Sequence, residues 1–246
     1  MIERRRGLIV AGVVTALIAL IVLFPARVAY RIVSSPLIVM SGITGTVWNG
    51  HAREFSTNGV YLRDLEWQIR PLRLFTGKIV YDISGSPVSG FLESEVAVGL
   101  GGSLTLSDLT ASVPLQMLEG AVGVAGLRGM ASLQFERLKL VDGRAVALDG
   151  TIDMADVVVP MVSRSSLGGY RAEFFTQDDS IVASVEDTDG VLDLAGSLTI
   201  SADKSYEFLG HVVPRNNTPS DLAQRVRLLP RADRPGQFVI QFGGSY

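Results

Sequence analysis

The feature that most constrains the fold is an alternation of apolar and polar residues, which recurs along much of the chain. If residues 65–69 are extended, Leu65, Trp67 and Ile69 share one face and the polar residues between them share the other. The same period of two recurs at residues 79–83, 192–200, 206–212 and 238–242. This period is typical of half-buried strands, and such strands favour an antiparallel sheet with one face on a core.

Asn-Gly and Asp-Gly pairs separate many of these runs, and such pairs suit turn positions with positive φ. They occur at residues 49–50, 58–59, 142–143, 149–150 and 189–190. Their spacing predicts a β meander of about ten to fourteen strands. Strands do not alternate with helical patterns, which argues against a parallel sheet.

One short helix is expected near the C-terminus. Thr218 is a suitable cap and Pro219 suits the first helical position. Leu222, Val226 and Leu229 then form an apolar stripe at helical spacing. Residues 114–119 are a weaker candidate for a single helical turn.

The N-terminal region has a different pattern. Residues 7–24 form an uncharged stretch of 18 residues, which as a helix would measure about 27 Å, close to the thickness of a membrane core. Arginines precede it at positions 4–6, and the short basic tail favours a cytoplasmic N-terminus. We therefore predict a cytoplasmic tail at 1–6, a transmembrane anchor at 7–26 and a β domain at 27–246 on the far side of the membrane, with a division near 125 as a variant.

A cleaved signal peptide is the rival interpretation of this N-terminal segment. Such peptides have a shorter apolar region and small residues before the cleavage site. Here Arg27 follows the apolar run closely, which favours an uncleaved anchor.

Composition excludes several classes of function. The net charge is −3, and the first six residues contribute +2, so the remainder is −5. An acidic domain is a poor binder of nucleic acid, which needs a surplus of Lys and Arg. The absence of cysteine excludes disulfides and thiolate metal sites. His51 and His211 lack metal-ligand spacing, and the acidic run at 186–190 fits a hairpin turn better than a calcium loop. We predict no enzyme activity, no metal and no cofactor.

Two tryptophan motifs carry a family resemblance. Residues 45–50 read GTVWNG, and residues 65–77 read LEWQIRPLRLFTG. Together with residues 138–157 and the closing segment 222–246, they resemble the type II secretion system protein N family. The motif positions are treated as structural rather than catalytic: Gly45, Trp48, Gly50, Trp67, Pro71 and Gly77.

The resemblance implies a single-pass protein of the bacterial inner membrane with its C-terminal domain in the periplasm. It also implies a likeness to the AsmA-like class of β-groove proteins, which are associated with lipid handling. The expected fold is mainly β: an N-terminal transmembrane helix, then a long antiparallel, curved sheet that is either a β-groove or sandwich-like, with one short C-terminal helix.

The function predicted from this resemblance is non-catalytic support of the export of folded proteins across the outer membrane. It would act through periplasmic contacts with other secretion-platform proteins. The alternative is a membrane-anchored, lipid-handling protein of the AsmA-like class. In that case an apolar groove would bind lipid, and the residues expected to line it are Leu65, Ile69, Leu192, Leu194 and Phe208.

Overall fold

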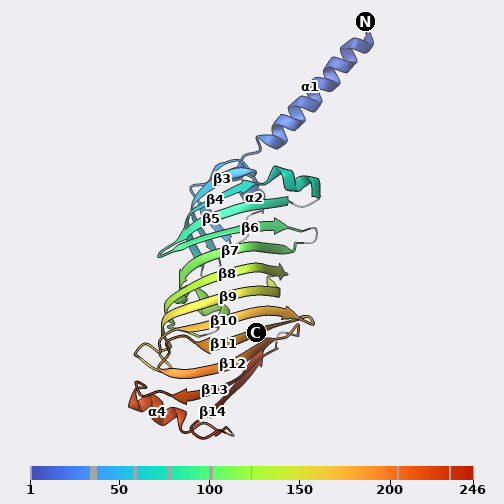
Figure 1. Ribbon diagram of the computed structural model, residues 1–246. Helices are drawn as coiled ribbons and strands as arrows, with labels where there is room; N and C mark the ends of the chain where they lie inside the picture. Colours follow the sequence, from blue (N-terminus) through green and yellow to red (C-terminus); the bar gives the residue numbers. More distant parts are fainter. Residues whose placement is uncertain are drawn as a thin grey trace.

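The protein is built on one long antiparallel sheet of 14 strands, shown by a computed structural model (Figure 1). The structure describes residues 2–33, 38–57, 60–76, 79–99, 102–122, 124–203, 205–232 and 234–245. Each strand from β3 (Asn49–Thr57) onward pairs with the next strand in the sequence, while β1 (Ile38–Ser41) pairs with β3 and the short β2 (Thr44–Gly45) lies beside β3. This is the predicted meander, with all pairs antiparallel. The sheet also continues across residue 125, since β7 (Leu104–Pro114) and β8 (Arg128–Val141) pair along their lengths.

The strands differ in length and are longest in the middle of the sheet. Their bounds are β1 Ile38–Ser41, β2 Thr44–Gly45, β3 Asn49–Thr57, β4 Val60–Ile69, β5 Ile79–Pro87, β6 Phe91–Val98, β7 Leu104–Pro114, β8 Arg128–Val141, β9 Arg144–Val158, β10 Tyr170–Gln177, β11 Ser180–Asp187, β12 Leu192–Ile200, β13 Ser205–Pro214 and β14 Phe238–Ser245. The helical segments are α1 Ile2–Val22, α2 Ala26–Val33, η1 Pro71–Thr76, η2 Leu115–Leu118, α3 Glu119–Val122 and α4 Ser220–Val226.

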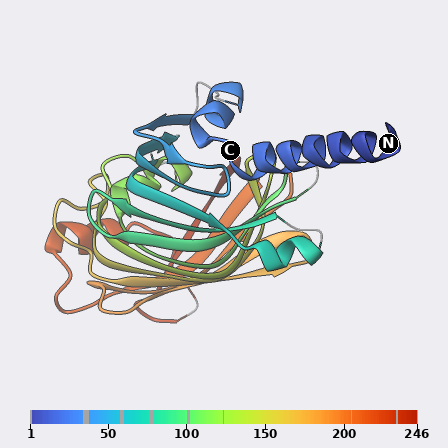
Figure 2. The ribbon, with the colours of Figure 1, turned by 90° about the horizontal axis from the view of Figure 1, so that it is seen from above.

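The sheet is strongly curved, and β-bulges explain part of the curvature. The register shifts between Arg63 and Glu66 in β4, between Glu93 and Glu95 in β6, and between residues 135 and 137 in β8. Asp108 lies opposite the shift in β6 and has a φ of 50°. Because a bulge bends its strand and increases the local twist, shifts in several strands curve the whole sheet, as the view from above shows (Figure 2).

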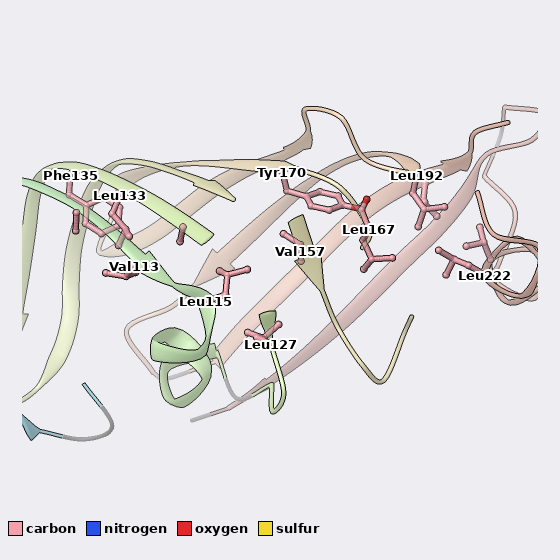
Figure 3. Packing of buried hydrophobic residues seen from close by; sticks show 14 of the residues in the cluster. Val113, Leu115, Leu127, Leu133, Phe135, Val157, Leu167, Tyr170, Leu192 and Leu222 are labelled. Carbon is pink, nitrogen blue, oxygen red and sulfur yellow. The ribbon is translucent and has the colours of Figure 1, made fainter. Parts of the chain in front are cut away.

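One face of the sheet, here called the apolar face, carries the core. Its main cluster spans β7 to β14 and is covered by η2, the segment 159–167 and α4. Figure 3 shows Val113, Leu115, Leu127 and Val157 of this cluster beside one another. A second cluster lies between α2 and strands β3 and β4, around Ala52. Met117 packs against both clusters, so together they form one continuous apolar region.

The sandwich-like alternative for the fold is wrong. In the part of the chain that the structure describes, the strands form a single sheet with no second sheet packed on it. The short covering segments bury only part of the apolar face, which accounts for the many half-buried apolar side chains in β4–β9. The fold is therefore an open, curved sheet of the kind that the resemblance implies.

The N-terminal region forms two helices rather than one. α1 projects away from the sheet, while α2 packs on it through Ala26 and Tyr30 (Figures 1 and 2). Among the described residues, no helix is both long enough and apolar enough to cross a membrane. The transmembrane anchor at 7–26 stays a prediction.

Two of the predicted turns are wrong, and close packing is the reason for one of them. Asp142–Gly143 and Asp189–Gly190 do separate strands, whereas Asn49–Gly50 begins β3 and Asp149–Gly150 lies inside β9. Gly150 has a φ of 140°, and a Cβ atom there would lie 2.2 Å from the Gln134 carbonyl oxygen. The glycine therefore permits close approach of two strands instead of a turn. The pair at 58–59 lies outside the described residues.

The predicted helix near the C-terminus is present as α4, and its apolar stripe is confirmed. Leu222 and Val226 are buried, and Leu229 packs against the same cluster. The predicted cap is wrong, because Pro219 rather than Thr218 precedes the first turn. The Thr218 hydroxyl instead donates a 2.5 Å hydrogen bond to the carbonyl oxygen of Val191, which directly precedes β12. The predicted turn at 114–119 is also present, as η2 and the start of α3.

Candidate functional site

The two tryptophan motifs meet where α1 joins the sheet. The indole N–H of Trp48 donates a 2.7 Å hydrogen bond to the carbonyl oxygen of Ile21, in the last turn of α1. The backbone N–H of Val47 donates to the Phe24 carbonyl at 3.0 Å, and Pro25 forms a β-bridge with Thr46. We call this region, residues 21–25 with 45–50 and Trp67, the helix–sheet junction.

Trp67 holds the sheet side of the junction. Its indole N–H donates a 3.1 Å hydrogen bond to the Thr46 carbonyl oxygen. Gly50 is its register partner on β3, and a Cβ atom at Gly50 would lie 2.3 Å from the Trp67 ring. The large ring therefore requires a glycine beneath it, which explains why these residue types occur together.

The remaining motif residues shape the backbone around the junction. Gly45 has a φ of 83°, and a Cβ atom there would lie 2.5 Å from the Asn49 carbonyl oxygen. Pro71 begins η1 directly after β4 and is exposed. Gly77 lies outside the described residues. Of the six motif residues, the structure brings Gly45, Trp48, Gly50 and Trp67 together.

A small apolar cavity of about 300 Å³ lies next to the junction. Ala26 and Tyr30 of α2 line one side of it, and Met40, Ile43 and Trp67 line the other. The Tyr30 hydroxyl lies 3.1 Å from the Ile38 carbonyl oxygen, to which it donates, and it accepts the Met40 N–H at 3.1 Å. The Arg27 Nε donates to the Ile43 carbonyl oxygen. These bonds fix α2 on the first strands.

The five residues predicted to line a groove lie on one face but at two separate places along the sheet. Register places all five on the apolar face, but Leu65 and Ile69 lie on β4 while the other three lie on β12 and β13. Leu65 is buried in the cluster beneath α2. Leu192 and Leu194 belong to the main cluster. Phe208 is buried and stacks on Phe242, with ring centroids 5.0 Å apart.

The opposite face carries ion pairs near the same end of the sheet. Arg70 lies 2.8 Å from Asp82 and 2.5 Å from Glu95, within an open cavity of about 610 Å³ that Asp108 and His51 also line. The hydrogen bond with Asp82 and the nearby negative charges raise the pKa of Arg70. Further along, Arg137 pairs with Asp149 and Arg171 with Asp153. In each of these two pairs, an arginine and an aspartate on neighbouring strands neutralise each other's charge.

One buried ion pair was not predicted from the sequence. Asp187 has only 4% of its side chain exposed, and Arg215 places a guanidinium nitrogen 2.8 Å from its Oδ2. The Oδ1 of Asp187 accepts the Leu194 N–H at 2.9 Å. Burial and the Asp187 charge raise the pKa of the neighbouring Tyr170 hydroxyl to about 12. The sequence does contain a sign of this pair. Asp187 lies two residues after Val185 on the same strand, so the alternation predicts an apolar side chain at position 187.

The geometry defines the class to which this protein belongs: a single open, curved antiparallel sheet that is joined to an N-terminal helix at one end. Residues 36–241 match the family model described as type II secretion system (T2SS), protein N. The chain therefore belongs to this family, which confirms the resemblance carried by the tryptophan motifs.

Two relatives show the extent of the similarity. The chain is 22% identical over 234 residues to the type II secretion system protein N of Aeromonas hydrophila, with 92% of each chain covered. It is 23% identical over 236 residues to the protein of the same name from Vibrio cholerae, with 92% of this chain and 93% of that one covered. No solved structure is significantly similar to this chain.

Proposed function

We propose that this protein is a non-catalytic component of the type II secretion system that supports export of folded proteins through periplasmic contacts. The observation that carries the proposal is the family match over residues 36–241, which covers nearly the whole sheet. The polar groups best placed for chemistry support a structural role, because Arg70, Asp82 and Glu95 are engaged with one another.

The proposed location is the bacterial inner membrane, with residues 1–6 in the cytoplasm and the sheet in the periplasm. The uncharged run at 7–24 supports this proposal. So does the exposure of Leu17, Ile18 and Leu20 on α1, since a helix in water seldom leaves so many apolar side chains uncovered. The junction would then hold the first end of the sheet next to the membrane surface.

A secretion assay tests the proposed function. The gene is deleted in its host, and the deletion is complemented with the full chain or with a chain carrying Trp48→Ala and Trp67→Ala. We expect the full chain to restore export of type II substrates and the double variant to restore it poorly. Cross-linking in intact cells followed by pull-down should recover secretion-platform subunits. Recovery of none of them, with export unaffected by the deletion, would refute the proposal.

Membrane attachment has its own test. After cell fractionation, we expect the full chain to stay with the inner membrane through an alkaline wash, and a chain that begins at residue 38 to be released. Release of the full chain by the wash would contradict the proposed anchor. That result would leave the proposed role in secretion to be decided by the secretion assay.

A second candidate function is lipid handling, and one feature of the apolar face favours it. Ile69, Tyr81, Val96, Leu106 and Leu138 lie directly opposite one another on successive strands and are only half-buried. An unbroken row of accessible apolar side chains is suited to a hydrocarbon chain.

Mass spectrometry of gently purified protein tests this second function. Lipid binding predicts bound phospholipid or glycolipid at a stoichiometric amount. We expect Leu106→Asp to abolish it and Thr105→Asp, on the opposite face, to leave it unchanged. A lipid-free protein would disfavour this function and would leave the first proposal standing.

A further inference from the structure

The last strand of the sheet has an open edge over its second half. In the part of the chain that the structure describes, β14 pairs along its length only with β13. The segment 230–232 covers the outer edge at the start of β14, where the Val239 N–H donates to the Pro230 carbonyl at 2.8 Å and Arg231 forms a β-bridge with Phe238. Because hydrogen-bonding groups alternate in direction along a strand, the N–H and C=O groups of Gln241 and Gly243 also point outward.

This edge lacks the features that usually protect an exposed strand. Such edges are normally very short, charged, bulged or interrupted by proline. Residues 236–246 contain no charged residue and no proline, and the pairing of β14 with β13 shows no register shift. At the other end of the sheet, β1 has four residues, and the outward Met40 N–H donates to the Tyr30 hydroxyl. Among the described residues, the short β1 edge is therefore partly covered by Tyr30, whereas the second half of the β14 edge is uncovered.

The side chains near the open edge also suit an approaching strand. Gly243 and Gly244 carry no side chain that could obstruct an approaching strand, although β13 already approaches both closely: a Cβ atom at Gly243 would lie 2.8 Å from the Tyr206 carbonyl oxygen, and one at Gly244 would lie 2.8 Å from the Tyr206 hydroxyl oxygen. Phe242 is 53% exposed although it stacks on the buried Phe208. A further strand would cover this exposed ring.

We propose that an extended segment of another secretion-system protein binds to β14 as an additional strand, at residues 240–245. This inference rests on the proposed function. The segment pairs with the outward groups of Gln241 and Gly243 and places an apolar side chain beside Phe242. An acidic residue at one end of the segment faces Arg231. This arginine is exposed and lies where the covered part of the β14 edge ends, and Arg227, four residues earlier in the sequence, is exposed as well.

A second copy of this chain fits the edge less well. Antiparallel pairing of two β14 strands would join the sheets end to end and place the two α1 helices at opposite ends of the combined sheet. Two helices so placed do not lie in one membrane, which the proposed anchor requires. The partner is therefore a different protein, located at the end of the sheet furthest from α1 (Figure 1).

Amide hydrogen exchange of the full chain tests the proposal, first alone and then in a complex purified after co-expression with the other secretion-platform proteins. Alone, the outward amides of Gln241 and Gly243 should exchange quickly and the inward amides of Ile240 and Phe242 slowly. In the complex, the outward amides should slow at least tenfold. A complex that leaves their exchange unchanged overturns this inference but supports the proposed function. Failure to form any complex overturns both.

Paired variants at one position separate the backbone from the side chain. Gln241→Pro removes an outward N–H without removing a donor to β13, and we expect at least a tenfold loss of recovered platform subunits. Gln241→Ala keeps the N–H and should bind as the wild type does. Equal binding of the two variants overturns the inference, and so does a doubled mass of the purified protein with protection of the same amides, which would identify a second copy as the occupant. If the proline variant fails to fold, the exchange measurement on the unaltered chain still decides.

Discussion

Gly50 and Trp67 depend on each other, because the indole occupies the space that any side chain at position 50 would need. A Cβ atom there would meet the ring at 2.3 Å. We expect Gly50→Ala to lower the free energy of unfolding by about 1–3 kcal/mol, as overpacking typically does. Gly85→Ala is the control, since its Cβ atom would meet nothing closer than 3.5 Å. Urea denaturation measures both, and equal stability of the two variants would contradict this account of the junction.

The buried pair of Asp187 and Arg215 makes a second prediction at the level of single residues. Arg215→Met leaves a carboxylate that is 4% exposed without its countercharge, and we expect a loss of about 1–3 kcal/mol because water reaches the site from the Arg215 side. Adding Asp187→Leu to that variant should restore much of the loss, since an apolar side chain suits this position. Urea denaturation measures both variants. If the double variant is less stable than Arg215→Met alone, Asp187 stabilises the fold by more than its pairing with the arginine charge.

At the level of elements, α4 contributes to stability through one face only. Leu222 is 2% exposed and Leu228, just beyond the helix, is 86% exposed. We expect Leu222→Ala to cost about 2–4 kcal/mol through lost burial and the cavity left behind. Leu228→Ala should change stability by less than about 0.5 kcal/mol. Thermal and urea unfolding of both variants check this pair, and a large cost at Leu228 alone would show that α4 packs differently.

Over the whole molecule, each strand contacts mainly its two neighbours, so stability is expected to vary along the sheet. The longest strands, β8 and β9, and most of the main cluster lie in the middle. We predict that amides in β7–β9 exchange most slowly and that protection falls toward β13 and β14 in the isolated protein. Hydrogen exchange with mass spectrometry measures this gradient. Equal protection in every strand would indicate a single cooperative unit.

Much of this architecture follows from local sequence. Alternation identifies the strands because side chains of an extended chain point to opposite faces, and it assigned residues such as Leu65 and Leu194 to the same face as the structure does. The turn at Asp142–Gly143 follows from local backbone preferences. Asp149–Gly150 has the same composition but lies inside a strand, since its glycine meets Gln134 and Phe135 from a neighbouring strand. The local sequence does not distinguish these two pairs.

The sequence by itself determined that this chain forms an antiparallel sheet with one apolar face, and its motifs determined its family. Only the tertiary structure decided that the sheet stays open, that Trp48 bonds the end of α1, and that Asp187 is paired with Arg215. The physical reason is the range of the interactions involved. Strand formation and turns depend on residues close together in the chain, whereas curvature, the helix–sheet junction and the buried ion pair depend on residues that meet only after the strands have assembled.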